Sequence, residues 1–303
     1  MLESSAMGKS RATSPVMPVG SVSVEKMPSH HLPATRTAVT GSRHNPSPLY
    51  LFSHWARTAT RLRRAKAIAL FMDFDGTLAP LKSRPQRVRL PADVRLALTR
   101  LSLDPKVRMW VVSGRLRADV QKRVNVAGIE HLGLHGWDRR NGPSLSLKAF
   151  QSLRTARQQI RERLRGLAGV WIEDKAPIFA IHYREASESA ARQAAAAVRE
   201  VVGQPLLASE LRLIEGLKVW EILPTGFKGK GAAITAVMAT LPSDTLAVYL
   251  GDETTDESGF AALPKGVTIR VGGSTRRTTA ARFYVHDPAE VARFLDKIEE
   301  TIR

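Results

Sequence analysis

The sequence predicts an α/β protein built on a doubly wound parallel sheet, with a smaller α+β unit inserted into it. Short, uncharged apolar runs alternate with helical patterns, which is typical of a parallel sheet buried on both faces. Two of these runs, residues 67–72 and 245–250, lead directly into carboxylates. Between them, over about residues 137–224, the order becomes helix, strand, strand, helix, strand, strand. That order is typical of helices packed on one face of an antiparallel sheet.

The composition excludes several classes of protein. The chain of 303 residues is 43% hydrophobic, which is enough for one large domain or two modest ones. It has no Cys, so disulfides, thiolate zinc sites and a Cys nucleophile are excluded, and a reducing compartment fits. No run of 18 or more apolar residues is present, so we expect no membrane-spanning helix and a cytoplasmic location.

Residues 1–66 are expected to form a basic N-terminal tail. Residues 1–48 are rich in Ser, Pro and Thr without periodicity, so we expect them to be disordered, and residues 50–66 could form a short basic helix. No amphipathic Arg-rich helix opens the tail, which favours a plain tail over an organelle transit peptide. The tail holds ten Lys or Arg and two Glu, a net +8 of the chain's +18.

This positive charge can indicate nucleic acid, an anionic membrane surface or acidic substrates such as phosphorylated small molecules. No basic run interleaved with aromatic residues is present, so we do not expect nucleic acid as a partner.

The chain is organised around the first strand end, Asp73-Phe74-Asp75-Gly76-Thr77. Gly76 breaks the extended run, so both carboxylates are expected to point into a crevice at the carboxyl end of the strand. Two acids so close repel each other unless a shared proton or a cation relieves them. Mg²⁺ is the simplest such cation.

The second strand, residues 107–112, follows a helix that starts at Pro91 and carries Val94, Leu98 and Leu101 on one face. The strand ends in Ser113-Gly114-Arg115 before a helix over 116–124. The Ser hydroxyl and the backbone amides there could hold an anion, or Ser113 could be an ordinary N-cap.

The insert follows a third short strand at 131–134, which runs into His135-Gly136-Trp137. We expect a helix over 148–165, strands over 170–173 and 178–183 around a turn at 174–177, and a helix over 187–202. Strands over 211–214 and 219–223 complete the unit. We interpret residues 137–224 as an inserted domain.

The α/β pattern then resumes. A helix is expected over 231–240, and the strand at 245–250 leads to Asp252 and Asp256. Strands at 267–271 and 283–285 precede a last helix, which Asp287 caps with Pro288 in its first turn. In a doubly wound sheet these strand ends converge with Ser113 and a Lys near 230. Carboxylates for nucleophilic and acid–base work, a cation, and Ser and Lys donors are the parts that phosphoryl transfer needs.

Four motifs resemble those of the haloacid dehalogenase superfamily of phosphohydrolases: Asp73-Phe74-Asp75-Gly76-Thr77-Leu78, Ser113-Gly114-Arg115, a Lys-Gly, and Gly251-Asp252-x-x-x-Asp256. The closer resemblance, over roughly residues 67–300, is to trehalose-6-phosphate phosphatases. It is carried by His135-Gly136, Asp174-Lys175, His182-Tyr183-Arg184, Gly216-x-Lys218-x-x-Glu221-Ile222-x-Pro224, Lys230-Gly231-x-Ala233-Ile234 and Gly251-Asp252-Glu253-Thr254-Thr255-Asp256-Glu257.

The resemblance implies a role for each matching residue. Asp73 is expected to be the nucleophile and Asp75 the acid and base, with Ser113 and Lys230 holding the phosphoryl group. Mg²⁺ is expected to be bound by Asp73, the backbone carbonyl of Asp75, and Asp252. Asp256 is expected to support these ligands without binding the metal itself. The expected substrate-binding residues are Arg115, Lys175, His182, Arg184, Lys218 and Glu221.

Two departures from the family pattern remain. Glu253 stands where the family usually has Asp, so it could shift an outer contact of the metal site. Lys228-Gly229 and Lys230-Gly231 both match the Lys motif, and Lys230 is preferred because Ala233 and Ile234 then fall in the family's positions.

The resulting hypothesis is a Mg²⁺-dependent trehalose-6-phosphate phosphatase of trehalose biosynthesis that works through an aspartyl-phosphate. Its catalytic core, with the haloacid dehalogenase fold, would comprise residues 67–136 and 225–303, and a cap over 137–224 would set specificity. Alternatives are a phosphatase for another sugar or glycoside phosphate, such as a sucrose or glucosylglycerol phosphate, and a non-catalytic sugar-phosphate-binding module. A monomer without membrane or nucleic-acid partners is favoured.

Overall fold

The structure is a computed structural model, and it describes residues 47–140, 145–175, 178–273 and 278–303. The chain divides into two units, residues 1–44 and 45–303, and only the second is described below. The disorder expected over residues 1–48 therefore lies almost wholly outside the described residues.

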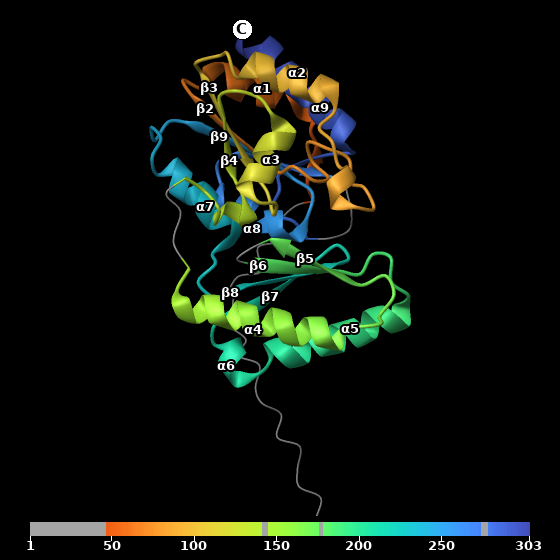
Figure 1. Cartoon of the computed structure of the whole chain (residues 1–303). Coiled ribbons are helices and arrows are strands. Elements are labelled where there is room, and N and C mark those ends of the chain that lie inside the picture. Colours follow the sequence, from red (N-terminus) through yellow and green to blue (C-terminus); the bar gives the residue numbers. More distant parts are fainter. Residues whose placement is uncertain (1–46, 141–144, 176–177, 274–277) are drawn as a thin grey trace, which may run out of the picture. The chain divides into compact units, whose positions relative to one another are not determined.

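A seven-stranded sheet forms the larger part of the second unit (Figure 1). Every pair of neighbouring strands is parallel, in the order β1-β11-β10-β9-β2-β3-β4. This confirms the predicted parallel sheet. The strands are β1 (Leu49–Tyr50), β2 (Ile68–Met72), β3 (Val107–Val112), β4 (Ile129–Leu132), β9 (Leu246–Gly251), β10 (Val267–Val271) and β11 (Phe283–Val285).

Helices cover both faces of this sheet, and alternate residues of β2 show why. Ile68, Leu70 and Met72 pack into a cluster with α1 (Trp55–Arg64), α2 (Ala92–Leu101), α3 (Arg117–Val124) and α9 (Pro288–Ile302). Ala69 and Phe71 pack on the other face with α7 (Gly229–Met238) and α8 (Glu257–Ala262). Burying each large apolar side chain contributes about 1.5–3 kcal/mol. Strand β2 is therefore packed on both faces, and this packing fixes the position of the residues that directly follow it.

Residues 47–66 add to the sheet, although the sequence analysis placed the first strand at residue 67. Leu49 pairs with Phe283 at the sheet edge, and the Tyr50 hydroxyl donates to Glu290 of α9 over 2.5 Å. A single 3-10 turn, η1 (Phe52–His54), then leads into α1. A two-residue strand is too short to leave a periodic pattern, which is why it was missed.

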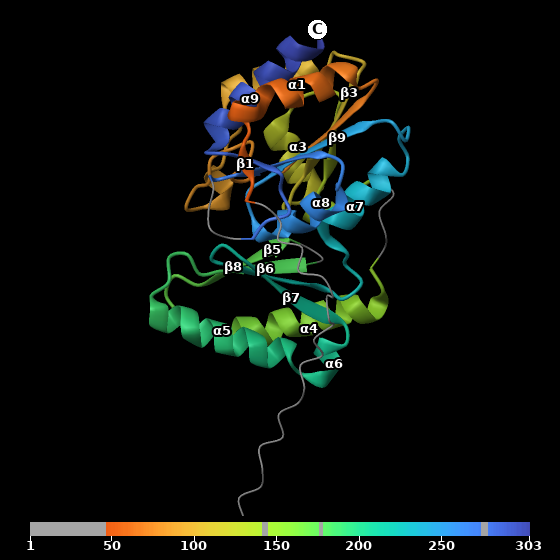
Figure 2. The same cartoon turned by 180° about the vertical axis from the view of Figure 1, so that it is seen from behind.

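The residues between β4 and β9 form a second, four-stranded antiparallel sheet in the order β5-β6-β8-β7. Its helices lie on one face, as Figures 1 and 2 show from opposite sides. The Ser146 and Ser187 hydroxyls cap the two long helices. The elements are α4 (Leu147–Arg163), β5 (Trp171–Lys175), β6 (Ile178–His182), α5 (Glu188–Val202), α6 (Pro205–Ala208), β7 (Leu211–Gly216) and β8 (Val219–Pro224).

Several predicted boundaries differ from the structure, and three of them affect residues discussed below. β4 ends at Leu132, because Leu134 and His135 have φ values of 46° and 54° and form η3 (Leu134–Gly136). β5 runs on to Lys175, through half of the expected turn; residues 176–177 lie outside the described residues. α7 begins at Gly229, two residues early.

Two further 3-10 turns are η2 (Pro85–Arg87) and η4 (Thr254–Asp256). None of the described helices is both long and apolar enough to cross a bilayer.

Candidate active site

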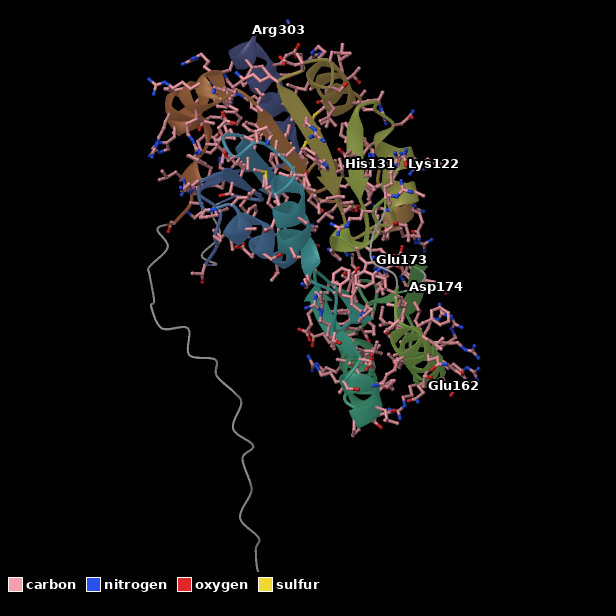
Figure 3. The ribbon with its side chains drawn as sticks, turned by 90° about the vertical axis from the view of Figure 1, so that its left-hand side faces the viewer. Lys122, His131, Glu162, Glu173, Asp174 and Arg303 are labelled. Carbon is pink, nitrogen blue, oxygen red and sulfur yellow. The ribbon has the colours of Figure 1, made fainter. Side chains whose placement is uncertain are left out.

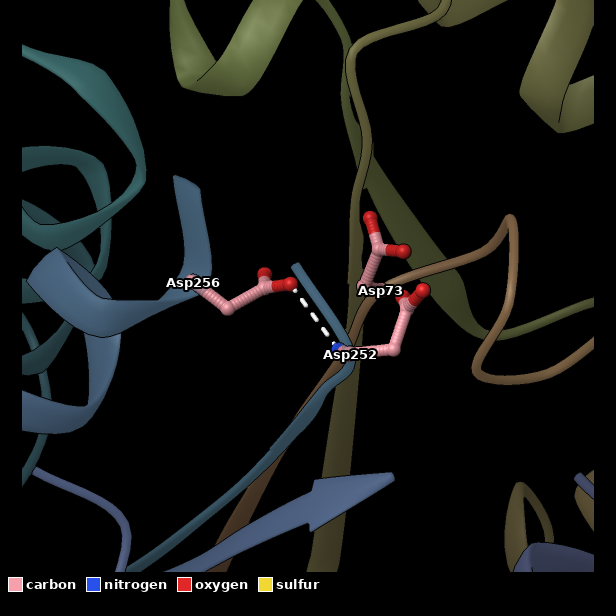
Figure 4. Close-up of side chains that lie close together, drawn as sticks. All are labelled: Asp73, Asp252 and Asp256. Atoms are coloured by element: carbon pink, nitrogen blue, oxygen red, sulfur yellow. Dashed lines mark hydrogen bonds between the residues drawn. The ribbon is translucent and has the colours of Figure 1, made fainter. Parts of the chain in front are cut away.

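The carboxylates gather where the strand order of the parallel sheet reverses. From β2 the chain passes to β3 on one side and later returns to β9 on the other, and such a switch point opens a crevice at the carboxyl ends of the strands. Asp73 follows β2, and its backbone N–H donates to the Leu250 carbonyl of β9 over 2.9 Å. One carboxylate oxygen each from Asp73, Asp252 and Asp256 lies within 4.8 Å of the others (Figure 4).

Lys230 is the cation that the fold brings to this cluster. Its Nζ lies 2.7 Å from Asp73 Oδ1 and 2.7 Å from Asp256 Oδ1, and the residue is only 2% exposed. The early start of α7 places Lys230 in the first turn of the helix. Lys228 is exposed, so of the two matching lysines the structure brings Lys230 to the carboxylates.

Asp256 holds the loop after β9 in place. Its Oδ2 accepts the backbone N–H groups of Asp252 and Glu253 over 3.0 and 2.9 Å, and its Oδ1 accepts the Tyr249 hydroxyl as well as Lys230 Nζ. The side chain is fully buried. Asp256 is therefore saturated with donors and fixes where Asp252 points.

The turn after Asp75 needs a residue without a side chain. Gly76 has a φ of 86°, and a Cβ there would lie 2.1 Å from Asp252 Oδ2. The next residue, Thr77, donates its hydroxyl to Asp252 Oδ1 over 3.1 Å. Gly76 thus lets the Asp252 carboxylate reach the crevice beside Asp73.

The cluster holds more negative charge than one lysine balances. Burial raises the pKa of Asp73 to about 8, against the opposing effect of Lys230. Burial and the charges of Asp73 and Asp256 raise the pKa of Asp252 well above its usual range. The pKa of Glu253 is also raised, mainly by burial. A divalent cation among hard oxygen donors would relieve this repulsion, so the residues fit a metal such as Mg²⁺.

Asp75 has a different partner. Arg115 donates two hydrogen bonds to the Asp75 carboxylate, from Nε over 2.6 Å and from Nη2 over 2.7 Å. The same guanidinium bonds Asp119 and the Pro85 carbonyl. Arg115 was expected to bind substrate, but its donors are largely engaged by Asp75 and its neighbours.

A small cavity of about 130 Å³ lies over these groups. Ser113 borders it and is 1% exposed, with its Oγ accepting the Arg115 backbone N–H over 3.2 Å. Of the sequence-predicted residues, Asp73, Asp75, Ser113, Arg115, Lys175, His182, Arg184, Glu221 and Lys230 line the cavity.

The antiparallel sheet closes the cavity from the opposite side. Lys175 Nζ lies 2.7 Å from Glu221 Oε1 and 3.4 Å from the Gly114 carbonyl, and Glu221 Oε2 lies 2.6 Å from His135 Nε2. Burial works against the ionisation of Glu221, yet Lys175 and His135 hold the pKa of Glu221 well below its usual range. Glu221 is therefore a buried carboxylate that joins the two sheets.

Glu173 is a pocket residue that the sequence analysis missed. Its Oε2 lies 2.8 Å from His182 Nε2, and the His182 ring stacks on Trp171 with centroids 4.1 Å apart. Glu173 and Lys175 share one side of β5, whereas Asp174 between them bonds Arg157 of α4 on the other side (Figure 3). Assigning Lys175 to a turn hid this alternation.

The last two predicted cap residues differ in position. Arg184 lines the cavity and donates to the Leu217 carbonyl over 3.2 Å. Lys218 has a φ of 63° in the tight β7–β8 turn, and its Nζ lies 5.7 Å from the centre of the Tyr183 ring. The structure does not bring Lys218 to the cavity wall.

The fold and the site together define a class, the proteins with a haloacid-dehalogenase-like fold and an inserted α+β unit. The structure of the C-terminal domain of Candida albicans trehalose-6-phosphate phosphatase superimposes with a TM-score of 0.73 at 19% identity, covering 85% of this chain and 100% of that one. A haloacid dehalogenase-like hydrolase from Bacteroides thetaiotaomicron has a TM-score of 0.55 at 13% identity and covers 77% and 100%. These likenesses establish the fold.

Sequence comparison then gives the family. The sequence model of the trehalose-phosphatase family matches residues 71–289. The chain is 35% identical over 243 residues to a trehalose-phosphate phosphatase of Mycobacterium marinum. The aligned region covers 76% of this chain and 61% of that protein. The chain belongs to the trehalose-phosphatase family. It spans about three fifths of the length of that relative.

Proposed function

We propose that the chain is a Mg²⁺-dependent phosphatase that hydrolyses trehalose 6-phosphate to trehalose and phosphate. The observation that carries this proposal is the arrangement of Asp73, Asp252 and Asp256 around Lys230 at the switch point of the sheet. The family, and the name of the Mycobacterium marinum relative, support the choice of substrate.

In the proposed first step, an Asp73 oxygen attacks phosphorus and the bond from phosphorus to the sugar oxygen breaks. Asp75 gives a proton to the departing sugar oxygen. The Lys230 ammonium and the Ser113 hydroxyl face the transferring phosphoryl oxygens, where such donors act most strongly because the site is buried. The product is trehalose with an aspartyl-phosphate on Asp73.

In the second step, Asp75 takes a proton from a water molecule, and that water attacks the same phosphorus. The bond to Asp73 breaks, phosphate leaves, and the Asp73 carboxylate is restored. Asp75 thus acts first as an acid and then as a base. The bidentate contact with Arg115 holds the Asp75 carboxylate in a fixed orientation for both proton transfers.

Mg²⁺ would be held by Asp73, Asp252 and the backbone carbonyl of Asp75, with Asp256 fixing the loop behind them. When bound, it supplies positive charge that offsets the repulsion between the attacking carboxylate and the phosphate. Glu253 lies next to Asp252 and carries a further charge that a cation would relieve. We therefore expect Glu253 to be compatible with metal binding.

We propose residues 137–224 as the cap that selects the sugar, with Glu173, Lys175, His182, Arg184 and Glu221 facing it. Carboxylates accept hydrogen bonds from neighbouring sugar hydroxyls, and lysines and arginines donate to them. The cavity of about 130 Å³ is smaller than the roughly 300 Å³ of the smallest ligand pockets. The cap must therefore move away from the parallel sheet to admit a disaccharide phosphate.

A panel of sugar phosphates tests the substrate. Phosphate release with Mg²⁺ present is measured for trehalose 6-phosphate, sucrose phosphate, glucosylglycerol phosphate and glucose 6-phosphate. The proposal predicts the highest kcat/KM for trehalose 6-phosphate. Preference for another member of the panel would move the assignment to that sugar, and no release from any member would favour a non-catalytic sugar-phosphate-binding module.

A further inference from the structure

A second and larger cavity lies beside the active site, at the two chain crossings between the parallel sheet and the cap. Its volume is about 720 Å³, within the roughly 300–1,000 Å³ that small-molecule pockets span. We call it the hinge cavity. Its walls come from η3 and the residues after it, from the residues after β8, and from α7; they include Trp137, Arg139, Phe227, Lys228, Ala233 and Ala236.

The hinge cavity is lined by aromatic and by small side chains. Trp137 is the first residue of the cap and Phe227 follows the cap, and their rings stack with centroids 5.8 Å apart at an angle of 20°. Ala232, Ala233 and Ala236 line the cavity from α7. Aromatic rings together with small side chains suit a cavity to a planar apolar ring.

The charge of the lining is of one sign. Arg139 and Lys228 contribute two cations, and none of the lining residues is Asp or Glu. Within the described part of the chain, neither cation forms an ion pair. An occupant with a negative group would therefore meet two unopposed positive charges.

His135 separates the hinge cavity from the active site and borders both. Its Nε2 bonds Glu221, whereas its Nδ1 is buried and has no partner among the described residues. The residue is 6% exposed, and its ring stands edge-on to Phe227 with centroids 6.0 Å apart. A buried ring nitrogen without a partner is a place where a ligand group gains a hydrogen bond.

We propose that the hinge cavity binds a small molecule that carries a planar apolar ring and one anionic group. The ring lies against Trp137 and Phe227, and the anion faces Arg139 and Lys228. This site is separate from the substrate pocket, and the inference does not depend on which sugar phosphate is hydrolysed. An occupant contacts both chain crossings and the Phe227 ring beside His135, so it touches the elements about which the cap moves.

Two fluorescent probes that differ only in the anion test the proposal. They are 8-anilino-1-naphthalenesulfonate and N-phenyl-1-naphthylamine, which lacks the sulfonate. Each is titrated into the full chain with Mg²⁺ present. The sulfonate is expected to bind about three- to fivefold more tightly, since an ion pair near a surface contributes up to about 1 kcal/mol. Equal or tighter binding of the neutral probe would refute the anionic part of the proposal.

Variants then locate the bound probe. Ala236→Phe fills the cavity from an exposed helix position and is expected to weaken the sulfonate probe by about tenfold. Lys228→Glu is expected to weaken the sulfonate and not the neutral probe. Lys122→Glu, an equal charge reversal on α3 (Figure 3), is the control and should change neither by more than about twofold. Sulfonate binding that survives both Ala236→Phe and Lys228→Glu unchanged would overturn the proposal.

Discussion

Arg115 holds the Asp75 carboxylate in a bidentate contact, with Nε and Nη2 lying 2.6 and 2.7 Å from its two oxygens. Arg115 is 8% exposed and also bonds Asp119, so one guanidinium orders two acids. A lysine cannot reproduce this geometry, because its ammonium is a point donor and not a planar fork.

Arg115→Lys is therefore expected to lower kcat by about tenfold or more while KM changes little, because Asp75 loses its fixed orientation. Steady-state kinetics on trehalose 6-phosphate with saturating Mg²⁺ measure both parameters. Arg117→Lys, a neighbouring arginine whose side chain does not contact Asp75, is the matched control. A rise in KM with kcat unchanged would instead show that Arg115 binds substrate directly.

Replacing each lysine in turn distinguishes the role of Lys230 from that of Lys228. Lys230→Met removes the donor that we propose for the phosphoryl group and is expected to lower kcat by about 10²–10³. It also leaves Asp73 and Asp256 without their buried cation, so the free energy of unfolding should fall by about 3–5 kcal/mol without Mg²⁺. Urea unfolding and kinetics measure the two effects. Lys228→Met should retain activity within about twofold, and the reverse pattern would assign the catalytic role to Lys228.

Glu221 is expected to act on the sugar and not on the chemistry. Glu221→Gln weakens charge-assisted hydrogen bonds of about 1.5–3 kcal/mol, so KM for trehalose 6-phosphate should rise about tenfold or more. Hydrolysis of p-nitrophenyl phosphate, which has no sugar, should change less than about threefold. Glu215→Gln, an exposed residue of β7 that pairs with Arg199 of α5, is the control. An equal loss on both substrates would place Glu221 in the phosphoryl-transfer machinery.

His131 gives the fold a pH dependence of its own. Burial, with a smaller effect of Arg117, lowers the pKa of this β4 histidine to about 4 (Figure 3). The unfolded chain takes up the proton near pH 6.5 but the folded chain does not, so stability falls as the pH drops from about 6.5 toward 4.

Between pH 7 and pH 5 this loss amounts to about 2 kcal/mol. His131→Gln has no such proton to take up, and its free energy of unfolding should therefore fall by about 2 kcal/mol less over that range. Urea titrations at the two pH values measure the difference. Identical pH dependence in the two proteins would show that His131 titrates normally.

The strand ends were predictable from sequence because each motif combines a buried apolar run with the residues that directly follow it. Asp73 and Asp252 needed only the parallel topology to become neighbours. Asp256 and Lys230 were also predicted, yet Tyr249, which donates to Asp256, was read only as part of an apolar strand.

The cap was less predictable, because its site depends on which side of each strand a residue occupies. A two-residue error in the end of β5 hid Glu173, although its spacing from Lys175 places both on one face. Lys218 matched a motif, but its direction depends on a turn with positive φ that no local pattern reveals. The pairing of Arg115 with Asp75 joins residues 40 positions apart and required the folded sheet.

Both steps of the proposed mechanism depend on Asp73 as the nucleophile. Its most direct test is phosphate release from trehalose 6-phosphate by the chain and by Asp73→Asn, with Mg²⁺ present and with circular dichroism to confirm folding. Asp73→Asn is expected to fold but to show no measurable turnover, since an amide cannot form the aspartyl-phosphate. Hydrolysis by Asp73→Asn at a rate close to that of the unaltered chain would contradict this mechanism.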